Sequence, residues 1–202
     1  MRWASLRSYE AWKFAKLQSA RETCGAQTLN PQTIDDTCCH RVVVASGAGV
    51  PYQKPPVQLG TVADAVASIV PTTEEFDVTI LLEPLNTRVD HPGVLFSRTE
   101  DAVAVIQAVQ SPRVRLLYDL YHSVTEGGDP ATVLPPVAHL VEHVQIADAP
   151  GRGEPGSGTI DWPAQLKLLG AVGYAGPLGV ECNPTTAPTG AALAWFRTLV
   201  SQ

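Results

Sequence analysis

The chain has 202 residues, 45% of them hydrophobic, and a formal net charge of −6. This length and apolar content are enough for one globular domain with a sizeable core. The acidic balance, without a basic cluster, argues against a nucleic-acid partner. The sequence shows no apolar run of about 18 residues and no secretory signal pattern, so we expect no membrane partner and a cytoplasmic location.

The first 40 residues are expected to form a separate N-terminal segment, a helix over residues 1–22 followed by a polar loop. Three cysteines lie in that loop, Cys24, Cys38 and Cys39. They lack the CxxC pairing of structural zinc sites, so ordinary reduced thiols are favoured over a metal role, which stays the alternative.

From Arg41 onward, short apolar strands alternate with helical periodicity, beginning with the strand RVVVA at Arg41–Ala45. The expected helices are Thr61–Val70, ended by Pro71; Glu100–Gln110, capped by Thr99; a short helix within Asp129–Glu142; Asp161–Leu169, begun by Asp161 with Pro163 in its first turn; and Thr189–Val200. This alternation predicts an α/β fold made of βα units.

Four later strands each carry an oxygen-bearing side chain at or near the carboxyl end: Glu83, Asp119, Gln145 and Glu181. These residues are 36, 26 and 36 positions apart. An eight-stranded βα barrel uses roughly 31 residues per unit, so each interval fits one strand, one helix and their loops. Because the active sites of such barrels lie at the carboxyl ends of the strands, the four side chains are expected to converge.

Three carboxylates and an amide that converge would repel one another unless a cation lay between them. Oxygen ligands alone suit magnesium or manganese better than zinc. The alternative is that each acidic residue only caps the helix that follows its strand, since Asp and Glu are favoured near helix N-termini. The sequence leaves both interpretations open for any single residue.

Two loops are expected to border this site. The Pro- and Gly-rich loop after the fourth strand end holds Asp148, Arg152 and Glu154. The segment Val89–Gly93 is expected to fold over the site. Arg152 offers a planar cation for a substrate carboxylate, with pairing to Glu154 as the alternative.

Four motifs in order, LLEPLNTRVDHPG, LLYDLYH, HVQIADAPGRGEPGSGTIDW and VECNP, resemble hydroxypyruvate isomerase, within the xylose isomerase-like barrels that also include the ketose 3-epimerases. The resemblance implies that Glu83, Asp119, Gln145 and Glu181 bind a divalent metal, magnesium or manganese. It also implies that Glu83 and Glu181 form the acid–base pair and that His122 and Arg152 hold the substrate. For His122, a core histidine satisfied by backbone is the alternative.

The family implies interconversion of hydroxypyruvate and tartronate semialdehyde by proton transfer through an enediolate. The second hypothesis is a ketose or sugar-acid epimerase or isomerase. The epimerases are the less favoured of these, because they usually place His where this chain has Gln145. A barrel endonuclease would need several zinc-binding histidines, and the histidines of this chain are not placed for that.

Glu181 follows the strand that we expect to be the last of an eight-stranded barrel. Counting back along the chain makes Arg41–Ala45 the fourth strand, so three βα units should precede Arg41. They would need roughly 93 residues, and 40 are present. We therefore expect a TIM-barrel-like domain over residues 41–202 that is incomplete and lacks most of the first three units. Its open strand edges would need cover, for which a homo-oligomer is one expectation. A non-catalytic remnant, or a partner of a complete paralogue, is the third hypothesis.

Overall fold

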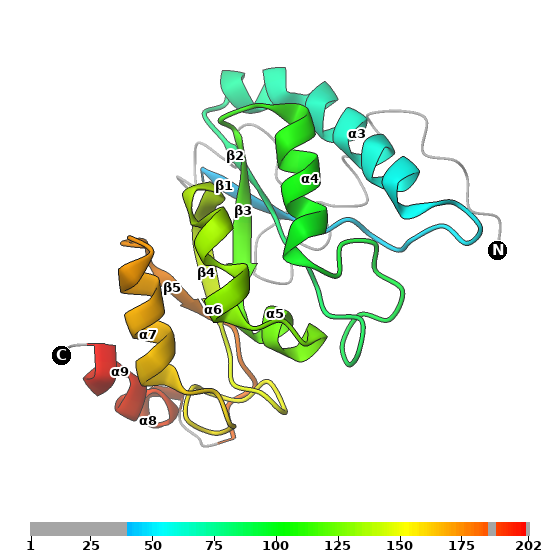
Figure 1. Ribbon diagram of the computed structural model, residues 1–202. Coiled ribbons are helices and arrows are strands. Elements are labelled where there is room, and N and C mark those ends of the chain that lie inside the picture. The colour runs from blue at the N-terminus through cyan, green and yellow to red at the C-terminus, as the bar shows by residue number, and fades with distance from the viewer. Residues whose placement is uncertain (1–39, 186–188, 201–202) are drawn as a thin grey trace.

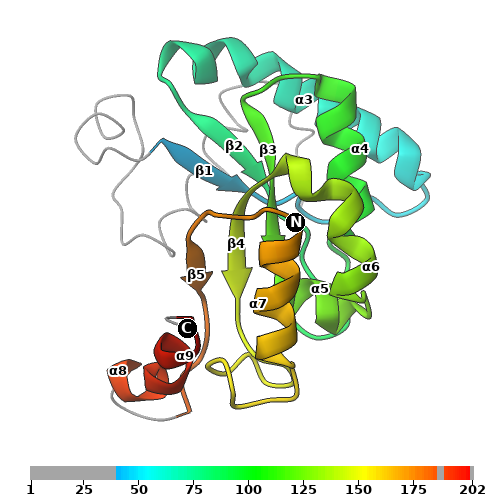
Figure 2. The ribbon, with the colours of Figure 1, turned by 60° about the vertical axis from the view of Figure 1, so that its left-hand side comes forward.

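A computed structural model describes residues 40–185 and 189–200 of the chain. The predicted N-terminal helix, its loop and the three cysteines Cys24, Cys38 and Cys39 lie outside these residues. Five strands form a single sheet: β1 (Arg41–Val44), β2 (Thr79–Leu82), β3 (Val114–Asp119), β4 (Val141–Ile146) and β5 (Leu178–Val180). All neighbouring pairs are parallel and follow chain order, so the predicted βα architecture is confirmed as a half-barrel (Figures 1 and 2).

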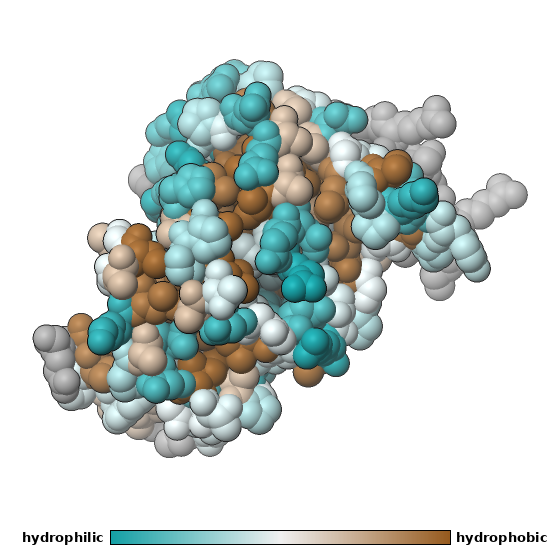
Figure 3. Space-filling model, viewed as in Figure 1, coloured by the Kyte–Doolittle hydropathy of each residue, from teal (hydrophilic) through white to brown (hydrophobic). Residues whose placement is uncertain are grey.

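Helices connect the strands or follow the last one, and those between the strands cover one side of the sheet (Figure 1). They are α3 (Pro55–Glu75), α4 (Thr99–Val109), α5 (Leu120–Glu126), α6 (Pro130–Val133), the 3-10 helix Pro135–Leu140, α7 (Trp162–Ala171), α8 (Thr189–Ala192) and α9 (Ala194–Val200). On the face shown in Figure 3, hydrophilic and hydrophobic side chains are interspersed. None of the helices in the described ranges is long and apolar enough to cross a membrane.

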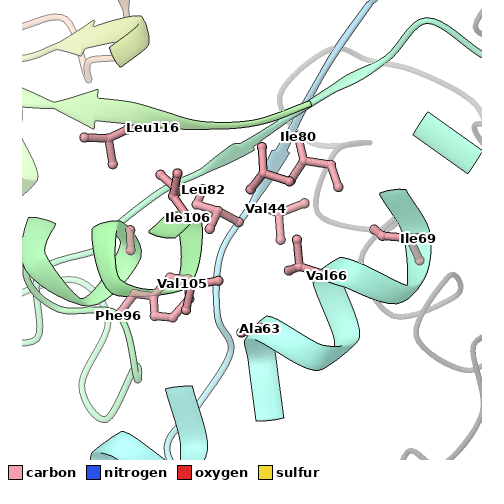
Figure 4. Packing of buried hydrophobic residues seen from close by; sticks show 12 residues of the cluster. Val44, Ala63, Val66, Ile69, Ile80, Leu82, Phe96, Val105, Ile106 and Leu116 are labelled. Atoms are coloured by element: carbon pink, nitrogen blue, oxygen red, sulfur yellow. The ribbon is translucent and has the colours of Figure 1, made fainter. Parts of the chain in front are cut away.

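One hydrophobic cluster fixes α3 and α4 against the first three strands (Figure 4). Val44, Ile80, Leu82 and Leu116 come from the strands, and Val66, Val105 and Ile106 come from the two helices. Burial of each such side chain contributes about 1.5–3 kcal/mol. Because the β-branched and leucine side chains alternate with residues facing the other side of the sheet, this packing sets which residues point into the half-barrel.

A second cluster joins β3 and β4 to α7 and α9. Its centre is the edge-to-face contact of the Trp162 and Phe196 rings, whose centroids are 5.3 Å apart. Leu199, from the last predicted helix, packs on the same cluster. That helix is, however, divided into α8 and α9 rather than continuous over Thr189–Val200.

The predicted helix Thr61–Val70 is too short, and Pro71 does not end it. The helix α3 begins at Pro55, where two prolines occupy the first turn and have no N–H to leave unpaired, and it continues through Pro71 to Glu75. Ile69 and Thr73 lie on its buried face on either side of Pro71. This packing stabilises the last turn despite the one backbone hydrogen bond that proline cannot make.

The start of α4 also differs from the prediction, whereas the start of α7 agrees with it. Thr99 is the first helical residue of α4, and Arg98 is the N-cap. The Asp101 carboxylate accepts from the backbone N–H of Arg98 at 3.0 Å, which satisfies that end of the helix. In α7, Asp161 is the N-cap and accepts from Ala164 N at 3.1 Å, as expected.

The two edge strands of the sheet, β1 and β5, each have one unpaired edge within the described residues. There, β1 pairs only with β2, and β5 pairs only with β4. The expectation of a homo-oligomer that covers these edges stays a prediction. Since all five strands run in parallel, their carboxyl ends lie along one rim of the half-barrel.

Candidate active site

Two buried carboxylates meet at this rim. Glu83 directly follows β2, and Asp119 is the last residue of β3; the two residues are 8% and 4% exposed. Glu83, Asp119 and His122 each offer a potential ligand atom, and these atoms lie within 4.8 Å of one another. The structure therefore brings together two of the four oxygen-bearing residues that the spacing predicted would converge.

Burial and mutual repulsion make these carboxylates hard to ionise. Burial has the largest effect on the pKa of Glu83 and, together with the smaller effects of the charges of Asp119 and Glu181, raises it to about 8. The positive charge of Arg152 acts in the opposite direction and lowers this pKa. Burial likewise raises the pKa of Asp119 to about 6, although the N–H of His122 and the charge of Arg152 oppose it. A positive charge at this point would relieve both effects.

Helix capping accounts for only part of this arrangement. Asp119 Oδ1 accepts from the backbone N–H of His122 at 3.0 Å, so Asp119 does cap α5. Its other oxygen, Oδ2, lies 3.8 Å from His122 Nε2. In the described part of the chain, no helix begins directly after Glu83 or Glu181, and the next helices along it, α4 and α8, start at Thr99 and Thr189. Capping therefore explains Asp119 in part and neither glutamate.

Gln145 and Glu181 extend the site across β4 and β5. Gln145 pairs in register with Asp119, and its Oε1 is buried with no hydrogen-bond partner among the described residues. The Glu181 carboxylate is 40% exposed and acts electrostatically on both Glu83 and Asp119. A buried amide oxygen that lacks a donor, beside carboxylates with raised pKa values, is a donor set that fits a hard divalent cation.

Arg152 reaches the site from the loop after β4. Its Nη2 lies 3.1 Å from Glu181 Oε2, and its guanidinium carbon lies 5.2 Å from the centroid of the Tyr121 ring. Glu154, the alternative partner considered from the sequence, instead accepts from Thr185 N at 2.7 Å and Thr185 Oγ1 at 2.8 Å. Arg152 thus places a cation beside the carboxylates, and Glu154 ties its loop to the segment after β5.

Asp148 organises the loop that carries Arg152. This fully buried carboxylate accepts from Ala149 N, Gly156 N, Ile160 N and Trp162 Nε1, at 2.7–3.1 Å. Although burial alone would raise its pKa, these hydrogen bonds outweigh burial and hold the pKa below its usual value. The sequence pointed to Asp148 only as one charged residue of a loop, because its donors are spread over 14 positions.

His122 is held from the β2 side of the site. It is 2% exposed, and its Nδ1 lies 3.2 Å from Asn86 N and 2.6 Å from Asn86 Nδ2. Burial, then the charges of Arg152 and His91, lower the pKa of His122 to about 3, so the ring is neutral at physiological pH. The backbone-satisfied histidine considered from the sequence is thus correct for Nδ1, while Nε2 faces Asp119.

The segment Val89–Gly93 lies against the site, as expected. Asp90 Oδ2 accepts from Tyr121 Oη at 2.8 Å, and the rings of His91 and His122 are 5.4 Å apart. Sequence reasoning missed Asn86, Asp90 and Tyr121 as site residues. The signal available for Asn86 was its place in the EPLN run, directly after a strand end.

A hollow adjoins this site and shares Asp119 with it. It lies between the start of α4 and α5, lined by residues that include Arg98, Thr99, Tyr118 and Ser123. Of the predicted site residues only Asp119 borders it. We therefore place the candidate site at the rim where Glu83, Asp119 and His122 meet.

Proteins named as isomerases are similar in sequence to part of this chain. A 2-oxo-tetronate isomerase of Cupriavidus necator is 36% identical over 120 residues, which are 59% of this chain and 45% of the relative. The Escherichia coli hydroxypyruvate isomerase is 35% identical over 120 residues, 59% and 46% of the two chains. A putative human hydroxypyruvate isomerase is 36% identical over 122 residues, 60% and 44%. Each match spans less than half the length of the relative.

Solved structures resemble between 83% and 97% of this chain. A family 2 AP endonuclease from Brucella melitensis superposes with a TM-score of 0.78 at 27% identity, over 97% of this chain and 71% of the other. A 3-keto-D-glucoside 4-epimerase from E. coli gives 0.69 at 27% identity, over 83% and 67%. The IOLI protein, which has a zinc atom bound, gives 0.73 at 17% identity, over 96% and 70%, and supports the fold alone.

A sequence model of one protein family matches residues 33–199, and its description is a xylose isomerase-like TIM barrel. The match takes in all five strands and the rim residues from Glu83 to Glu181. The chain therefore belongs to the xylose isomerase-like TIM barrel family.

Proposed function

We propose that this chain is an isomerase of short keto acids that interconverts hydroxypyruvate and tartronate semialdehyde. The observation that carries the proposal is the meeting of Glu83 and Asp119 at the rim, with the Arg152–Glu181 pair beside them. Acid–base groups and a cation for a substrate carboxylate are thereby within one site. The names of the curated relatives favour this reaction class.

The reaction moves a carbonyl by one carbon. One glutamate removes a proton from the hydroxymethyl carbon of hydroxypyruvate, which gives an enediolate, and a proton returned to the neighbouring carbon gives the aldehyde. We assign these transfers to Glu83 and Glu181, with their roles reversed in the opposite direction. A carboxylate can accept a proton and the resulting carboxyl can give it back, so one residue can serve in both directions.

The ligands of the metal would be Glu83, Asp119, Gln145 and Glu181. Magnesium or manganese, when bound by these oxygens, supplies positive charge beside the substrate oxygens. Such an ion would also satisfy the Gln145 amide oxygen, which lacks a donor among the described residues. Arg152 would orient the substrate carboxylate through its planar guanidinium, and His122 would hydrogen-bond a substrate oxygen.

A second substrate is supported by the relative from Cupriavidus necator, which is named for 2-oxo-tetronate. This substrate keeps the carboxylate and the neighbouring carbonyl, so the same residues could act on it. Only the space around the far end of the substrate would distinguish the two compounds. Testing both compounds is therefore part of the experiment.

Proton exchange followed by NMR tests the proposal. The purified full chain is incubated in deuterated water with hydroxypyruvate or 2-oxo-tetronate, with added magnesium or manganese or with a chelator. We expect metal-dependent deuterium incorporation and the appearance of the isomeric product with one of the two. A folded sample that exchanges neither compound under any metal condition would overturn the proposal and favour the non-catalytic hypothesis.

A further inference from the structure

We propose that Asn86 fixes the tautomer of His122, so that Nε2 carries the proton and the ring is a hydrogen-bond donor instead of a metal ligand. The role toward substrate rests on the proposed function, whereas the tautomer does not. Two consequences follow for the site. The metal is left with oxygen ligands only, and one neutral N–H is directed at the space between the carboxylates.

The first step is the pair of donors at His122 Nδ1. The backbone N–H of Asn86 lies 3.2 Å from Nδ1, and the Asn86 amide nitrogen lies 2.6 Å from it. A neutral imidazole has one nitrogen that accepts and one that donates. Since a backbone N–H can only donate, Nδ1 must be the acceptor, and the proton must be on Nε2.

The orientation of the Asn86 amide is fixed by its other contacts. Its Oδ1 accepts from Val89 N and from Asp90 N, each at 3.0 Å, and its Nδ2 donates to Asp90 Oδ2 at 2.6 Å. A flipped amide would set its oxygen against the Asp90 carboxylate and its NH2 against two N–H donors. The network thus determines which amide atom faces His122.

Asp90 is itself held in place. Its Oδ2 accepts from Tyr121 Oη at 2.8 Å, and Asn86 is fully buried beneath it. The loop after β2 and the first turn of α5 are therefore joined through one set of hydrogen bonds that ends at His122 Nδ1. This makes Asn86 a positioning residue that acts through His122.

The tautomer decides whether His122 can bind a metal. Its ring lies in the cluster with Glu83 and Asp119, and Nε2 is 3.8 Å from Asp119 Oδ2. Histidines that bind metals usually donate their second N–H to a carboxylate or carbonyl, which leaves a lone pair for the ion. Here the second nitrogen accepts instead, so Nε2 has no lone pair to offer. A nitrogen ligand that would favour zinc is thereby withheld.

NMR of the uniformly ¹⁵N-labelled, metal-free full chain tests the tautomer directly. Long-range ¹H–¹⁵N correlations of the histidine rings, with His122 assigned by loss of its signals in His122→Gln, are expected to show a protonated Nε2 and an unprotonated Nδ1. A through-hydrogen-bond ¹⁵N–¹⁵N coupling is expected between Asn86 and His122 Nδ1. A protonated Nδ1 would overturn the proposal, and so would the absence of this coupling.

A charge-conserving exchange tests whether Asn86 sets the tautomer. In the wild type, Asn86 Nδ2 donates to Asp90 Oδ2. The double variant Asn86→Asp with Asp90→Asn reverses this hydrogen bond, so that the new carboxylate at position 86 accepts from the amide at position 90 and also from His122 Nδ1. The proton of His122 is expected to move from Nε2 to Nδ1. Asn183→Asp, which places a new carboxylate near Arg152 but not at His122 Nδ1, should leave the tautomer unchanged. A folded double variant with Nε2 still protonated would contradict the part of the proposal that assigns control of the tautomer to the Asn86 side chain.

Electron paramagnetic resonance with manganese tests the metal side. The wild-type complex is expected to show no imidazole nitrogen coupling, and the double variant is expected to gain one. Nitrogen coupling in the wild type that disappears in His122→Gln would overturn the proposal. If manganese does not bind at all, the proposed function fails, while the NMR measurement still decides the tautomer.

Discussion

The Arg152 guanidinium lies 3.1 Å from the Glu181 carboxylate, and this ion pair joins the loop after β4 to the residue that follows β5. Both partners are also proposed to meet the reactants, Arg152 through the substrate carboxylate and Glu181 through the metal and the transferred proton. Since the pair is partly open to solvent, it contributes more to placing Arg152 than to stability.

Replacing Arg152 should therefore impair substrate use more than folding. A lost hydrogen bond to a charged group costs about 1.5–3 kcal/mol, so Arg152→Ala should lower kcat/KM by roughly 10- to 150-fold. Arg152→Lys keeps the charge without the planar fork and should recover only part of the loss. Steady-state kinetics with each keto acid measures this. An effect below about twofold for Arg152→Ala would refute its role.

Removing the acid–base pair should abolish turnover. Glu83→Gln keeps the size of the side chain but cannot take a proton, and general acid–base groups typically contribute about 10²- to 10⁴-fold in rate. Glu181→Gln should have a comparable effect. The matched control is Glu142→Gln, since Glu142 pairs with Arg41 at the amino ends of the strands. The assignment fails if either site variant turns over at the wild-type rate while its melting curve is unchanged.

The stability of the metal-free protein should depend on pH through Glu83. Its pKa is raised from 4.5 to about 8, so its contribution to stability is complete below pH 4.5 and is lost as the pH rises through 8. The lowered pKa of His122 acts in the opposite sense, because its contribution is complete above pH 6.5 and is lost as the pH falls through about 3. Between pH 6.5 and 8 Glu83 therefore dominates.

We expect the melting temperature of the wild type, measured with a chelator, to fall from pH 6.5 to just above pH 8. Glu83→Gln should show a flatter profile, because its side chain stays neutral. Added manganese should reverse the fall in the wild type, since a bound cation stabilises the ionised carboxylates. Parallel profiles for the two proteins would show that Glu83 is not the group responsible.

The strand ends could be predicted from the sequence because two local signals agree there. Runs such as Thr79–Leu82 are β-branched and apolar, and they stop at a charged residue and a proline. The regular intervals then placed Glu83 and Asp119 at one rim, as the structure does. Their burial and raised pKa values could not be read from spacing, because they depend on what covers the rim.

The remaining details depend on contacts between distant positions. Asn86 and His122 are 36 positions apart, and nothing in either local motif indicates that they touch. The extension of α3 through Pro71 depends on packing against the sheet, which outweighs the local tendency of proline to end a helix. Local pattern thus located the site, while tertiary contacts fixed how its side chains are held.

Asp148→Asn should disturb the site through the Arg152 loop. The substitution removes the charge that accepts from Gly156 N and Trp162 Nε1 and turns an amide NH2 toward N–H donors. We expect a loss of about 1.5–3 kcal/mol in the free energy of unfolding, together with reduced kcat/KM. Asp161→Asn is the matched control, because Asn and Asp are equally good at an N-cap. Chemical denaturation of both variants measures the difference, and equal stability of the two would mean that Asp148 does not anchor the loop.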